Sequence, residues 1–340
     1  MRLLFITQIV DRNDGVLGFV HGWLVELAQV FEQVHVICLR KGETTLPENV
    51  TVYSLGKEDG VSRVKYLRRF FSNVIGLRRE YDGVFVHMNS EYVILAGILW
   101  RMWGKKIVLW YNHTFGNWKT KLAMILANTI CCTSRFSYTA GTRKTAIMPA
   151  GIDTRVFKPD TSVERIPRSV LYLGRIAPIK GVHILVEAVK KLHRRGVSCK
   201  LDIYGEALPR DNEYENSLKA SADDSITFYG RIPHREAVTA FRSHEIFVNL
   251  TPSGNYDKTV LEAMACGGVS LVSSAAFGEI LTGEFQFKEG NAEDLARALE
   301  KTLARSASDR QILGEKFSRY VVENHDLQLL AKKIRALYGN

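Results

Sequence analysis

The sequence has few of the features that would indicate a secreted, zinc-binding or membrane-spanning protein. Its 340 residues include five cysteines, an odd number without metal-type spacing, mostly in apolar strand-like runs: Cys38, Cys131, Cys132, Cys199 and Cys266. We interpret them as reduced structural thiols of a cytosolic protein and expect no metal site. Residues 3–10 are apolar, but they lack a basic leader and a small-residue cleavage site, which favours a first strand over a signal peptide. The most apolar run, Tyr92–Trp100, has about half the length that a bilayer requires.

Positive charge is concentrated in the N-terminal half. Residues 1–150 hold 19 Lys and Arg against 11 Asp and Glu, whereas residues 151–340 hold 27 against 25, within a net charge of +10. Nucleic acid, anionic lipid and an acidic polymer are all compatible with such a basic surface. Nucleic acid is disfavoured, because no recognition-helix or RNA-binding pattern accompanies the charge.

One segment of this half, Val61–Arg79, combines six Lys and Arg with many apolar side chains. This mixture is expected of a helix that lies on anionic headgroups. An ordinary amphipathic helix, packed on a sheet with its arginines in solvent, explains the pattern equally well.

Strand-like and helix-like segments alternate along the chain, with no internal repeat or low-complexity tract. In the first half, strands are predicted over Arg2–Val10, Val34–Leu39, Val50–Ser54, Gly83–His87, Lys106–Trp110, Thr129–Cys132 and Thr145–Met148. In the second half, they are predicted over Val170–Leu173, Cys199–Tyr204, Ile226–Tyr229, Ile246–Leu250 and Val269–Val272. Such alternation is typical of doubly wound parallel α/β sheets, and the length suits two domains of about 150–170 residues each.

The stretch Asn249–Ser274, NLTPSGNYDKTVLEAMACGGVSLVSS, is the most informative part of the sequence. An apolar strand runs into a polar loop, a short helix is predicted over Thr259–Cys266, and Gly267 ends it before the next strand. Unpaired N–H groups at the start of such a helix favour an anion such as a phosphate. Glu262, one turn into the helix, offers a carboxylate to vicinal hydroxyls such as those of a ribose. The combination indicates a nucleotide site, although a Gly-containing turn alone is common.

Three segments resemble retaining glycosyltransferases of family 4, which have the two-domain GT-B fold. Val260–Gly268 (VLEAMACGG) is similar to the donor-site motif of that family, and Met148–Phe157 (MPAGIDTRVF) is similar to its crossover between domains. Gly174–Gly181 has an Arg followed five residues later by Lys-Gly, as in the family. The resemblance covers nearly the whole chain. It implies two Rossmann-like doubly wound domains facing across a cleft.

The resemblance also implies domain boundaries. Residues 1–150 are expected to form the acceptor-side domain and residues 168–322 the nucleotide-sugar donor domain. Residues 151–167 are expected to be the crossover linker, and a C-terminal helix within residues 323–340 is expected to pack back on the first domain.

Individual residues receive roles from the same resemblance. His113 matches a histidine placed near the transferred sugar, while Arg175 and Lys180 match the cations that hold the donor diphosphate. These three are the candidate catalytic residues. The candidate donor-binding residues are Gly15, Gly18, Gly205, Ile232, Gly254, Asn255, Asp257, Lys258, Thr259 and Glu262, with Ile232 expected to contact the nucleobase. Without the resemblance, the first two glycines are equally well explained as turn residues, and Arg175 and Lys180 as surface cations.

One position departs from the family motif. Family members usually carry a Glu, seven residues and a second Glu; Glu262 matches the second, but Gly254 occupies the place of the first. Since the first Glu reaches the donor sugar in the family, three alternatives remain: a different donor, substitution by Asn255 or Asp257, or an inactive binding protein. Asp257 directly precedes the predicted helix, so N-capping explains it equally well. Lys258 would add a compensating phosphate contact.

The implied activity is transfer of a sugar from a UDP- or GDP-linked donor, with retention of configuration and without a metal or cofactor. Positive groups would stabilise the departing diphosphate, and front-face attack would give retention. We find no paired carboxylates for a glycosidase-type mechanism. The expected acceptor is a glycan or lipid-linked glycan of cell-surface polysaccharide or glycolipid synthesis.

The expected location is the cytoplasm, peripheral on the inner face of the cell membrane through Val61–Arg79. A catalytically silent nucleotide-sugar-binding partner of a glycan-assembly complex is the alternative function. A nucleotide-sugar epimerase is disfavoured by the carboxylate-poor donor loop.

Overall fold

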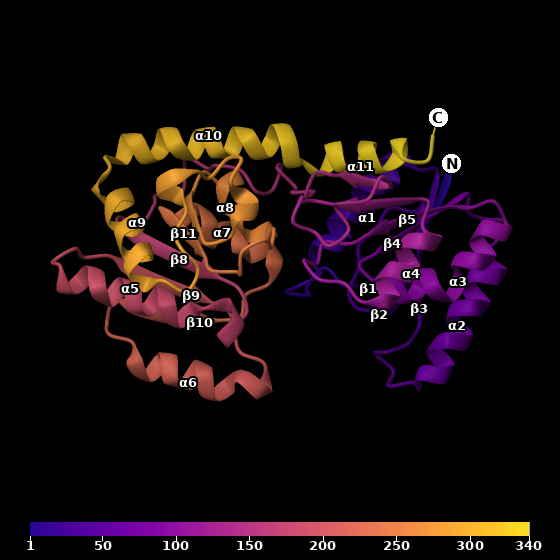
Figure 1. Cartoon of the computed structure of the whole chain (residues 1–340), viewed down its shortest axis with the longest axis horizontal. Coiled ribbons are helices and arrows are strands. Elements are labelled where there is room, and N and C mark those ends of the chain that lie inside the picture. The colour runs from indigo at the N-terminus through magenta and orange to yellow at the C-terminus, as the bar shows by residue number, and fades with distance from the viewer. Residues whose placement is uncertain (340) are drawn as a thin grey trace. The chain divides into compact units, whose positions relative to one another are not determined.

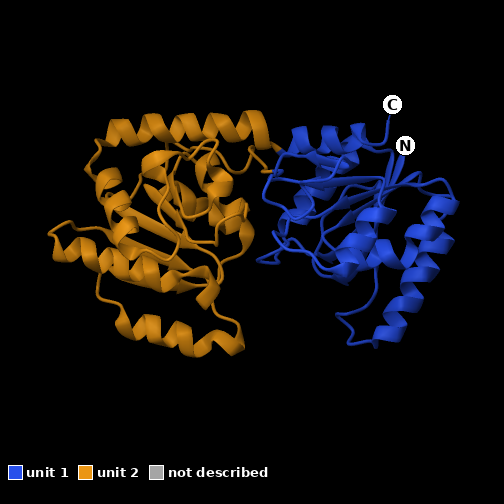
Figure 2. Ribbon diagram, viewed as in Figure 1, with its two compact units in different colours: residues 1–151, 327–340 blue, residues 152–326 orange. Residues whose placement is uncertain are grey.

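The computed structural model describes residues 1–339, which divide into two compact units (Figure 2). Unit 1 comprises Met1–Gly151 and the C-terminal segment from Leu327, and unit 2 comprises Ile152–Asp326. Each unit has its own parallel sheet with helices on both faces (Figure 1). The predicted fold class, two doubly wound α/β domains, is therefore confirmed.

Unit 1 is built on a seven-stranded parallel sheet in the order β3-β2-β1-β4-β5-β6-β7. The strands are β1 (Arg2–Val10), β2 (Gln33–Lys41), β3 (Val50–Ser54), β4 (Gly83–His87), β5 (Lys106–Trp110), β6 (Thr129–Cys132) and β7 (Thr145–Ile147). The helices are α1 (Phe19–Val30), α2 (Arg63–Gly76), α3 (Ser90–Met102), α4 (Trp118–Leu126) and α11 (Leu327–Ala336).

Alternate residues of β1 face the two helical layers of unit 1. Leu3 and Phe5 pack with α1 and α11, whereas Leu4 and Ile6 pack with α2, α3 and α4. Successive side chains of a strand point to opposite faces of the sheet, so a continuous apolar run such as β1 indicates a strand covered on both sides.

Unit 2 has a five-stranded parallel sheet in the order β10-β9-β8-β11-β12. The strands are β8 (Ser169–Leu173), β9 (Lys200–Tyr204), β10 (Ile226–Gly230), β11 (Ile246–Asn249) and β12 (Val269–Val272). The helices are α5 (Val182–Arg194), α6 (Asn212–Ser221), α7 (Ala237–Ser243), α8 (Lys258–Ala265), α9 (Ala292–Ala304) and α10 (Ala307–His325).

Helix α10 covers α8 at very short range. A Cβ atom added at Gly314 of α10 would lie 2.1 Å from the carbonyl oxygen of Gly267, which follows the C-cap residue of α8. Ser318 of α10 donates a hydrogen bond of 2.9 Å to the carbonyl of Ala265. The short helix α8 is thus held against α10 at its C-terminal end.

The order of the strands reverses once in each sheet, between β1 and β4 and between β8 and β11. In open α/β folds, ligands bind in front of the carboxyl ends of the strands at such switch points. We therefore expect a ligand site in the loops after these four strands.

The described residues contain no helix that is long and apolar enough to cross a membrane. All five cysteines are free and buried, and burial raises the pKa of the Cys38 and Cys266 thiols to about 12. Within residues 1–339, no group of three or more His, Cys, Asp or Glu is placed to hold a metal ion.

Candidate functional site

The loops after β8 and β11 meet at the switch point of unit 2. Lys180 ends the first loop, and its Nζ lies 3.1 Å from Oδ2 of Asp257 and 3.1 Å from Oγ1 of Thr251, both in the second loop. Asp257 Oδ2 also accepts hydrogen bonds from Thr251 Oγ1 (2.9 Å) and Asn249 Nδ2 (3.3 Å). Burial alone would raise the pKa of Asp257, but the Lys180 ammonium and these hydrogen bonds outweigh it and hold that pKa below its usual value. Lys180 is therefore anchored at the carboxyl edge of the sheet.

The interpretation of Asp257 as a helix cap is wrong. Asp257 occupies the N-cap position of α8, but its side chain makes no capping hydrogen bond. The carboxylate bonds instead to Lys180, and a charge-assisted bond of this kind is stronger than a bond to a neutral amide. The first turn of α8 consequently keeps N–H groups that this carboxylate does not occupy.

The first turn of α8 carries two unusual polar groups. Thr259 Oγ1 is buried and has no hydrogen-bond partner among residues 1–339. Burial lowers the pKa of Lys258 to about 7, against the opposing effect of the Glu262 carboxylate. Buried polar groups in proteins nearly always have a partner, and strongly perturbed pKa values concentrate at functional sites. Both observations indicate that the start of α8 is suited to a ligand.

Glu262 lies one turn further along α8 and is paired with a histidine that the sequence analysis missed. The Oε1 of Glu262, which is buried, lies 2.8 Å from Nε2 of His234, in the loop after β10. Burial lowers the pKa of His234, but the attraction and hydrogen bond of Glu262 outweigh it, so the pKa is raised overall. The ring of Phe157 packs against His234 with the centroids 5.3 Å apart. The only sequence signal was a polar residue just after a strand end, next to Ile232.

Gly254 is required by the shape of its loop. Its φ angle is +92°, in a region that residues with a Cβ atom rarely adopt. The N–H of Gly254 donates to Ser274 Oγ (3.1 Å), and that hydroxyl donates to the carbonyl of Asn255 (2.6 Å). The side-chain amide of Asn255 donates in turn to the carbonyl of Pro252 (2.9 Å). A glycine thus suits the backbone conformation of this loop, at the position where the resemblance places a Glu.

The remaining predicted residues of unit 2 lie at the carboxyl edge of the same sheet. Gly205 follows β9, and a Cβ atom there would lie 1.9 Å from the carbonyl oxygen of Gly174, so close backbone packing explains this glycine. Arg175 is exposed in the loop after β8, and Ile232 is half-buried in the loop after β10, beside His234. The structure therefore brings the candidate residues of unit 2 to the loops that follow β8, β9, β10 and β11.

The predicted residues of unit 1 lie at the carboxyl edge of the other sheet. Gly15 and Gly18 follow β1; a Cβ atom at Gly18 would lie 2.4 Å from the carbonyl oxygen of Asp14. His113 follows β5, and its ring stacks on Phe115 with centroids 5.4 Å apart. Burial lowers the pKa of His113, which favours the neutral imidazole at neutral pH.

The segment directly after β4 in unit 1 has a backbone conformation that the sequence did not indicate. Met88, directly after β4, has a φ angle of +66°, and the adjacent Asn89 Oδ1 accepts a hydrogen bond of 2.8 Å from Gln8 Nε2. Positive φ at a non-glycine residue is uncommon and is often found at functional sites. This feature marks the switch point between β1 and β4.

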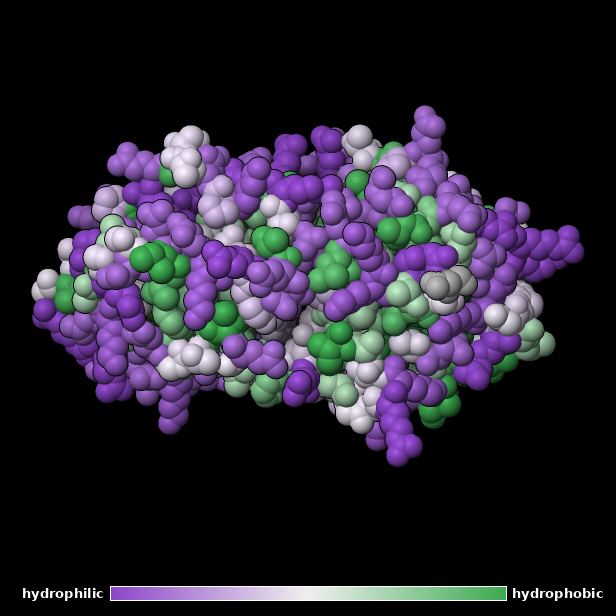
Figure 3. Space-filling view, turned by 90° about the horizontal axis from the view of Figure 1, so that it is seen from above, coloured by the Kyte–Doolittle hydropathy of each residue, from purple (hydrophilic) through white to green (hydrophobic). Residues whose placement is uncertain are grey.

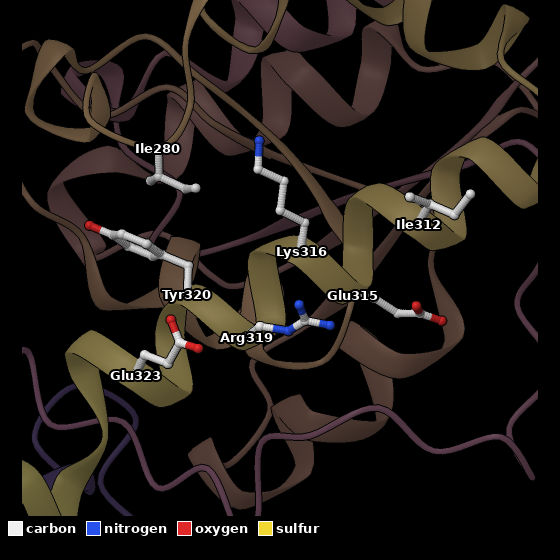
Figure 4. A pocket seen from close by; sticks show the side chains of 7 residues that line it. All are labelled: Ile280, Ile312, Glu315, Lys316, Arg319, Tyr320 and Glu323. Atoms are coloured by element: carbon white, nitrogen blue, oxygen red, sulfur yellow. The ribbon is translucent and has the colours of Figure 1, made fainter.

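A hollow of 360 Å³ lies elsewhere in unit 2 (Figure 4). Its lining comes from α10 and from Ile280, which faces Tyr320 in the figure: Ile280, Ile312, Glu315, Lys316, Arg319, Tyr320 and Glu323. The lining mixes both charge signs with apolar groups and includes no predicted site residue. The surface seen in Figure 3 likewise shows apolar side chains in small groups among polar ones. We therefore place the candidate site at the strand ends.

Part of the chain is similar to a known protein family. Residues 167–305 match the family model "Glycosyl transferases group 1". Over this segment the chain is similar to the glycosyl transferases group 1 family. The group 1 segment contains the whole cluster at the switch point of unit 2, including Lys180, Asp257, Glu262 and the unpredicted His234.

Curated relatives share limited identity with this protein. A phosphatidylinositol N-acetylglucosaminyltransferase subunit from Arabidopsis thaliana is 26% identical over 167 residues, 47% of this chain and 37% of that protein. A D-inositol 3-phosphate glycosyltransferase of Pseudarthrobacter chlorophenolicus is 30% identical over 231 residues, 56% of this chain and 54% of that protein. The chain thus spans about a third to a half of the length of these relatives.

Solved structures match the whole chain and show its fold. Anabaena HepE in complex with UDP and glucose has a TM-score of 0.77 at 16% identity, covering 99% of both chains. Sucrose-phosphate synthase from Thermosynechococcus elongatus also has a TM-score of 0.77 at 16% identity, covering 99% of this chain and 98% of that one. The chain therefore has the GT-B fold, as the resemblance implied.

Proposed function

We propose that the protein transfers a sugar from a nucleoside diphosphate sugar, UDP- or GDP-linked, to a glycan or lipid-linked acceptor. The observation that carries this proposal is the cluster at the switch point of unit 2. There Lys180 contacts the loop that leads into α8, and α8 carries Glu262; all of these lie within the segment that matches the group 1 family. The relatives and solved structures support the proposal, since UDP and UDP-glucose are bound in structures of HepE.

Each part of a nucleotide sugar has a proposed partner in the cluster. The diphosphate is placed against Lys180, Arg175, the first-turn N–H groups of α8 and the Thr259 hydroxyl. The ribose hydroxyls are placed on Glu262, whose orientation is set by His234, and the base on Ile232. These positive groups would stabilise the charge on the departing diphosphate. We propose that they do so without a metal ion.

We further propose that the configuration of the sugar is retained, through front-face attack in which a donor phosphate oxygen takes the proton of the acceptor hydroxyl. The acceptor would be held by the strand ends of unit 1, near His113. Two relatives are named for phosphatidylinositol and D-inositol 3-phosphate as substrates, which supports a polar acceptor that is lipid-linked or phosphorylated. We place the protein in the cytoplasm, in the synthesis of a cell-surface polysaccharide or glycolipid.

Two observations favour a second candidate, a catalytically silent binding partner of a glycan-assembly complex. Gly254 stands where the family has a sugar-contacting Glu, and its φ of +92° is incompatible with a simple replacement. Lys180 is paired with Asp257, which offsets part of the positive charge that a leaving group would need. A silent partner would bind the nucleotide sugar and leave it intact.

Release of free nucleoside diphosphate tests the two candidates. The protein is incubated with UDP- and GDP-sugars, with and without glycan acceptors and with EDTA present, beside Lys180→Met and the surface control Lys219→Met. We expect release by the native protein and by Lys219→Met but at least tenfold less by Lys180→Met. Binding without release supports the silent partner. The absence of both binding and release would overturn both candidates.

A further inference from the structure

Helices α3 and α4 of unit 1 present large apolar side chains to solvent. Leu95, Ile98 and Met102 of α3 are 39%, 63% and 75% exposed, and Trp118 and Ile125 of α4 are 68% and 66% exposed. The spacings of three, four and seven residues place each set on one stripe of its helix. These five residues are called the apolar surface of α3 and α4. Soluble proteins rarely expose so many large apolar side chains on adjacent elements without a binding role.

The two helices are packed side by side, so their stripes belong to one surface. Lys119 at the start of α4 lies 3.8 Å from Glu91 at the start of α3, and Arg101 at the end of α3 donates to the carbonyl of Leu126 at the end of α4 (3.1 Å). In addition, a Cβ atom added at Gly97, in the middle of α3, would lie 3.2 Å from the Leu126 side chain. The helices thus run in the same direction at close range.

The charge around this surface has one dominant sign. Arg101, Lys119 and Lys121 lie on α3 and α4, and the neighbouring α2 adds four Lys and Arg, whereas Glu91 is the only acidic residue in the three helices. Helix α2 joins the same layer through Phe70, whose ring lies 5.0 Å from that of Tyr92 in α3. An apolar stripe bordered by cations is complementary to lipid tails below anionic headgroups.

We propose that the apolar surface of α3 and α4 docks the protein on an anionic lipid bilayer. Trp118 lies at the start of α4 beside Lys119, an arrangement suited to the boundary between tails and headgroups. The proposal deepens the proposed function and rests on it for its purpose, because a lipid-linked acceptor lies in that bilayer. The sequence analysis expected the membrane contact on Val61–Arg79, which contains α2. The proposal places this contact on α3 and α4 instead.

Helix α2 divides its apolar side chains between the surface and the core. Its Val64, Leu67 and Ile75 are exposed, but Phe70 and Val74 are buried in the core of unit 1. Packing on the sheet and on α3 therefore explains part of its amphipathic pattern. This places α2 at the border of the docking surface.

Vesicle co-sedimentation tests the proposal with the full chain. Vesicles of phosphatidylcholine alone are compared with vesicles of equal parts phosphatidylcholine and phosphatidylglycerol, at low and high salt. We expect binding to the anionic vesicles, weakened by salt. The double variant Met102→Ser/Ile125→Ser should lower the partition coefficient at least tenfold, since burial of each side chain contributes about that factor. Lys119→Gln/Lys121→Gln should lower it about fivefold per lysine on anionic vesicles.

The controls distinguish the surface from its alternatives. Ile312→Ser/Val322→Ser removes two exposed apolar side chains of α10 in unit 2 and should leave binding unchanged. Val64→Ser/Leu67→Ser tests α2. Stronger loss in this α2 variant than in the α3–α4 variant would overturn the proposal, as would equal binding by all variants. Concentration-dependent dimerisation abolished by Met102→Ser/Ile125→Ser, without vesicle binding, would overturn it too and show a second copy as the occupant.

Tryptophan fluorescence gives an independent readout. Trp23, Trp100 and Trp110 are fully buried and Trp103 is half-buried, whereas Trp118 is exposed. We expect anionic vesicles to shift the emission to the blue, and Trp118→Phe to abolish the shift while retaining most of the binding. A shift that persists in Trp118→Phe would contradict the proposed orientation. UDP binding, measured in parallel, separates failure of this surface from failure of the donor site in unit 2.

Discussion

Replacement of Asp257 by Asn should lower the stability of unit 2 and, at the same time, tighten binding of a nucleoside diphosphate. The carboxylate receives hydrogen bonds from Lys180, Thr251 and Asn249, and it is the anionic partner of Lys180. In Asp257→Asn the neutral hydrogen bonds can be retained but the ion pair is lost. Stability and affinity therefore move in opposite directions.

The size of the stability effect follows from the contacts. A hydrogen bond to a charged group contributes about 1.5–3 kcal/mol, and both side chains of the pair are 25% exposed, so we expect a loss of about 2 kcal/mol. For a unit of this size that corresponds to roughly 4–8 °C in Tm.

The effect on affinity follows from Coulomb's law. A diphosphate bound by Lys180 would lie about 6 Å from Asp257, because the ammonium would stand between the two anions at ion-pair distance from each. At an effective dielectric constant of about 20, a pair of unit charges at that distance interacts by about 3 kcal/mol before screening. Removal of the carboxylate charge should therefore tighten UDP or GDP binding about tenfold.

A double-mutant cycle provides the assay. Asp257→Asn, Lys180→Met and the double variant are compared by thermal unfolding and by calorimetric titration with UDP and GDP. We expect a coupling energy of about 1–2 kcal/mol in stability, and no gain in affinity from Asp257→Asn once Lys180 is absent. Weaker nucleotide binding in Asp257→Asn, or additive effects on stability, would refute this account of the pair.

Three other changes test separate parts of the site. In His234→Gln, stability should fall at acidic pH and differ little at alkaline pH. The raised pKa of His234 gives a stabilisation that is full below about pH 6.5 and is lost as pH rises through the folded-state pKa. Urea titrations at several pH values measure the free energy of unfolding, and a loss that does not depend on pH would contradict this prediction. The affinity of the native protein for UDP should fall as pH rises through about 7, where Lys258 loses its charge. In calorimetric titrations, Lys258→Met should remove this pH dependence. If the pH dependence of UDP affinity is unchanged in the variant, Lys258 is not a phosphate contact. Gly254→Glu should destabilise unit 2 by about 1–2 kcal/mol because of the positive φ, and Gly254→Ala by a similar amount; an unchanged Tm in both would show that the loop relaxes.

The fold was predictable because its signals are local. Buried strands such as Lys106–Trp110 and Val269–Val272 are largely apolar, and a parallel sheet covered on both faces favours such runs. Helix α6 was not predicted, since Leu218 is the only buried residue among its ten and leaves no apolar period. Helix α7 has only seven residues, too few to show a period.

The candidate site was only partly predictable, because its contacts join distant loops. Lys180 and Asp257 are 77 residues apart in sequence, and His234 and Glu262 are 28 apart. Sequence placed Lys180, Asp257 and Glu262 in the site, but the pairing that turns Asp257 away from the helix start depends on the neighbouring positions of β8 and β11. The positive φ of Gly254 is likewise a property of the folded loop.

Calorimetric titration of nucleoside diphosphates tests the central claim, a donor site at the strand ends of unit 2, most directly. UDP and GDP are titrated into the native protein, Lys180→Met and the control Lys219→Met, whose lysine pairs with Glu215 on the surface of α6. The account predicts that at least one nucleotide binds, that Lys180→Met weakens binding tenfold or more, and that Lys219→Met leaves it unchanged. Failure of both nucleotides to bind, or equal binding by Lys180→Met, would contradict the claim.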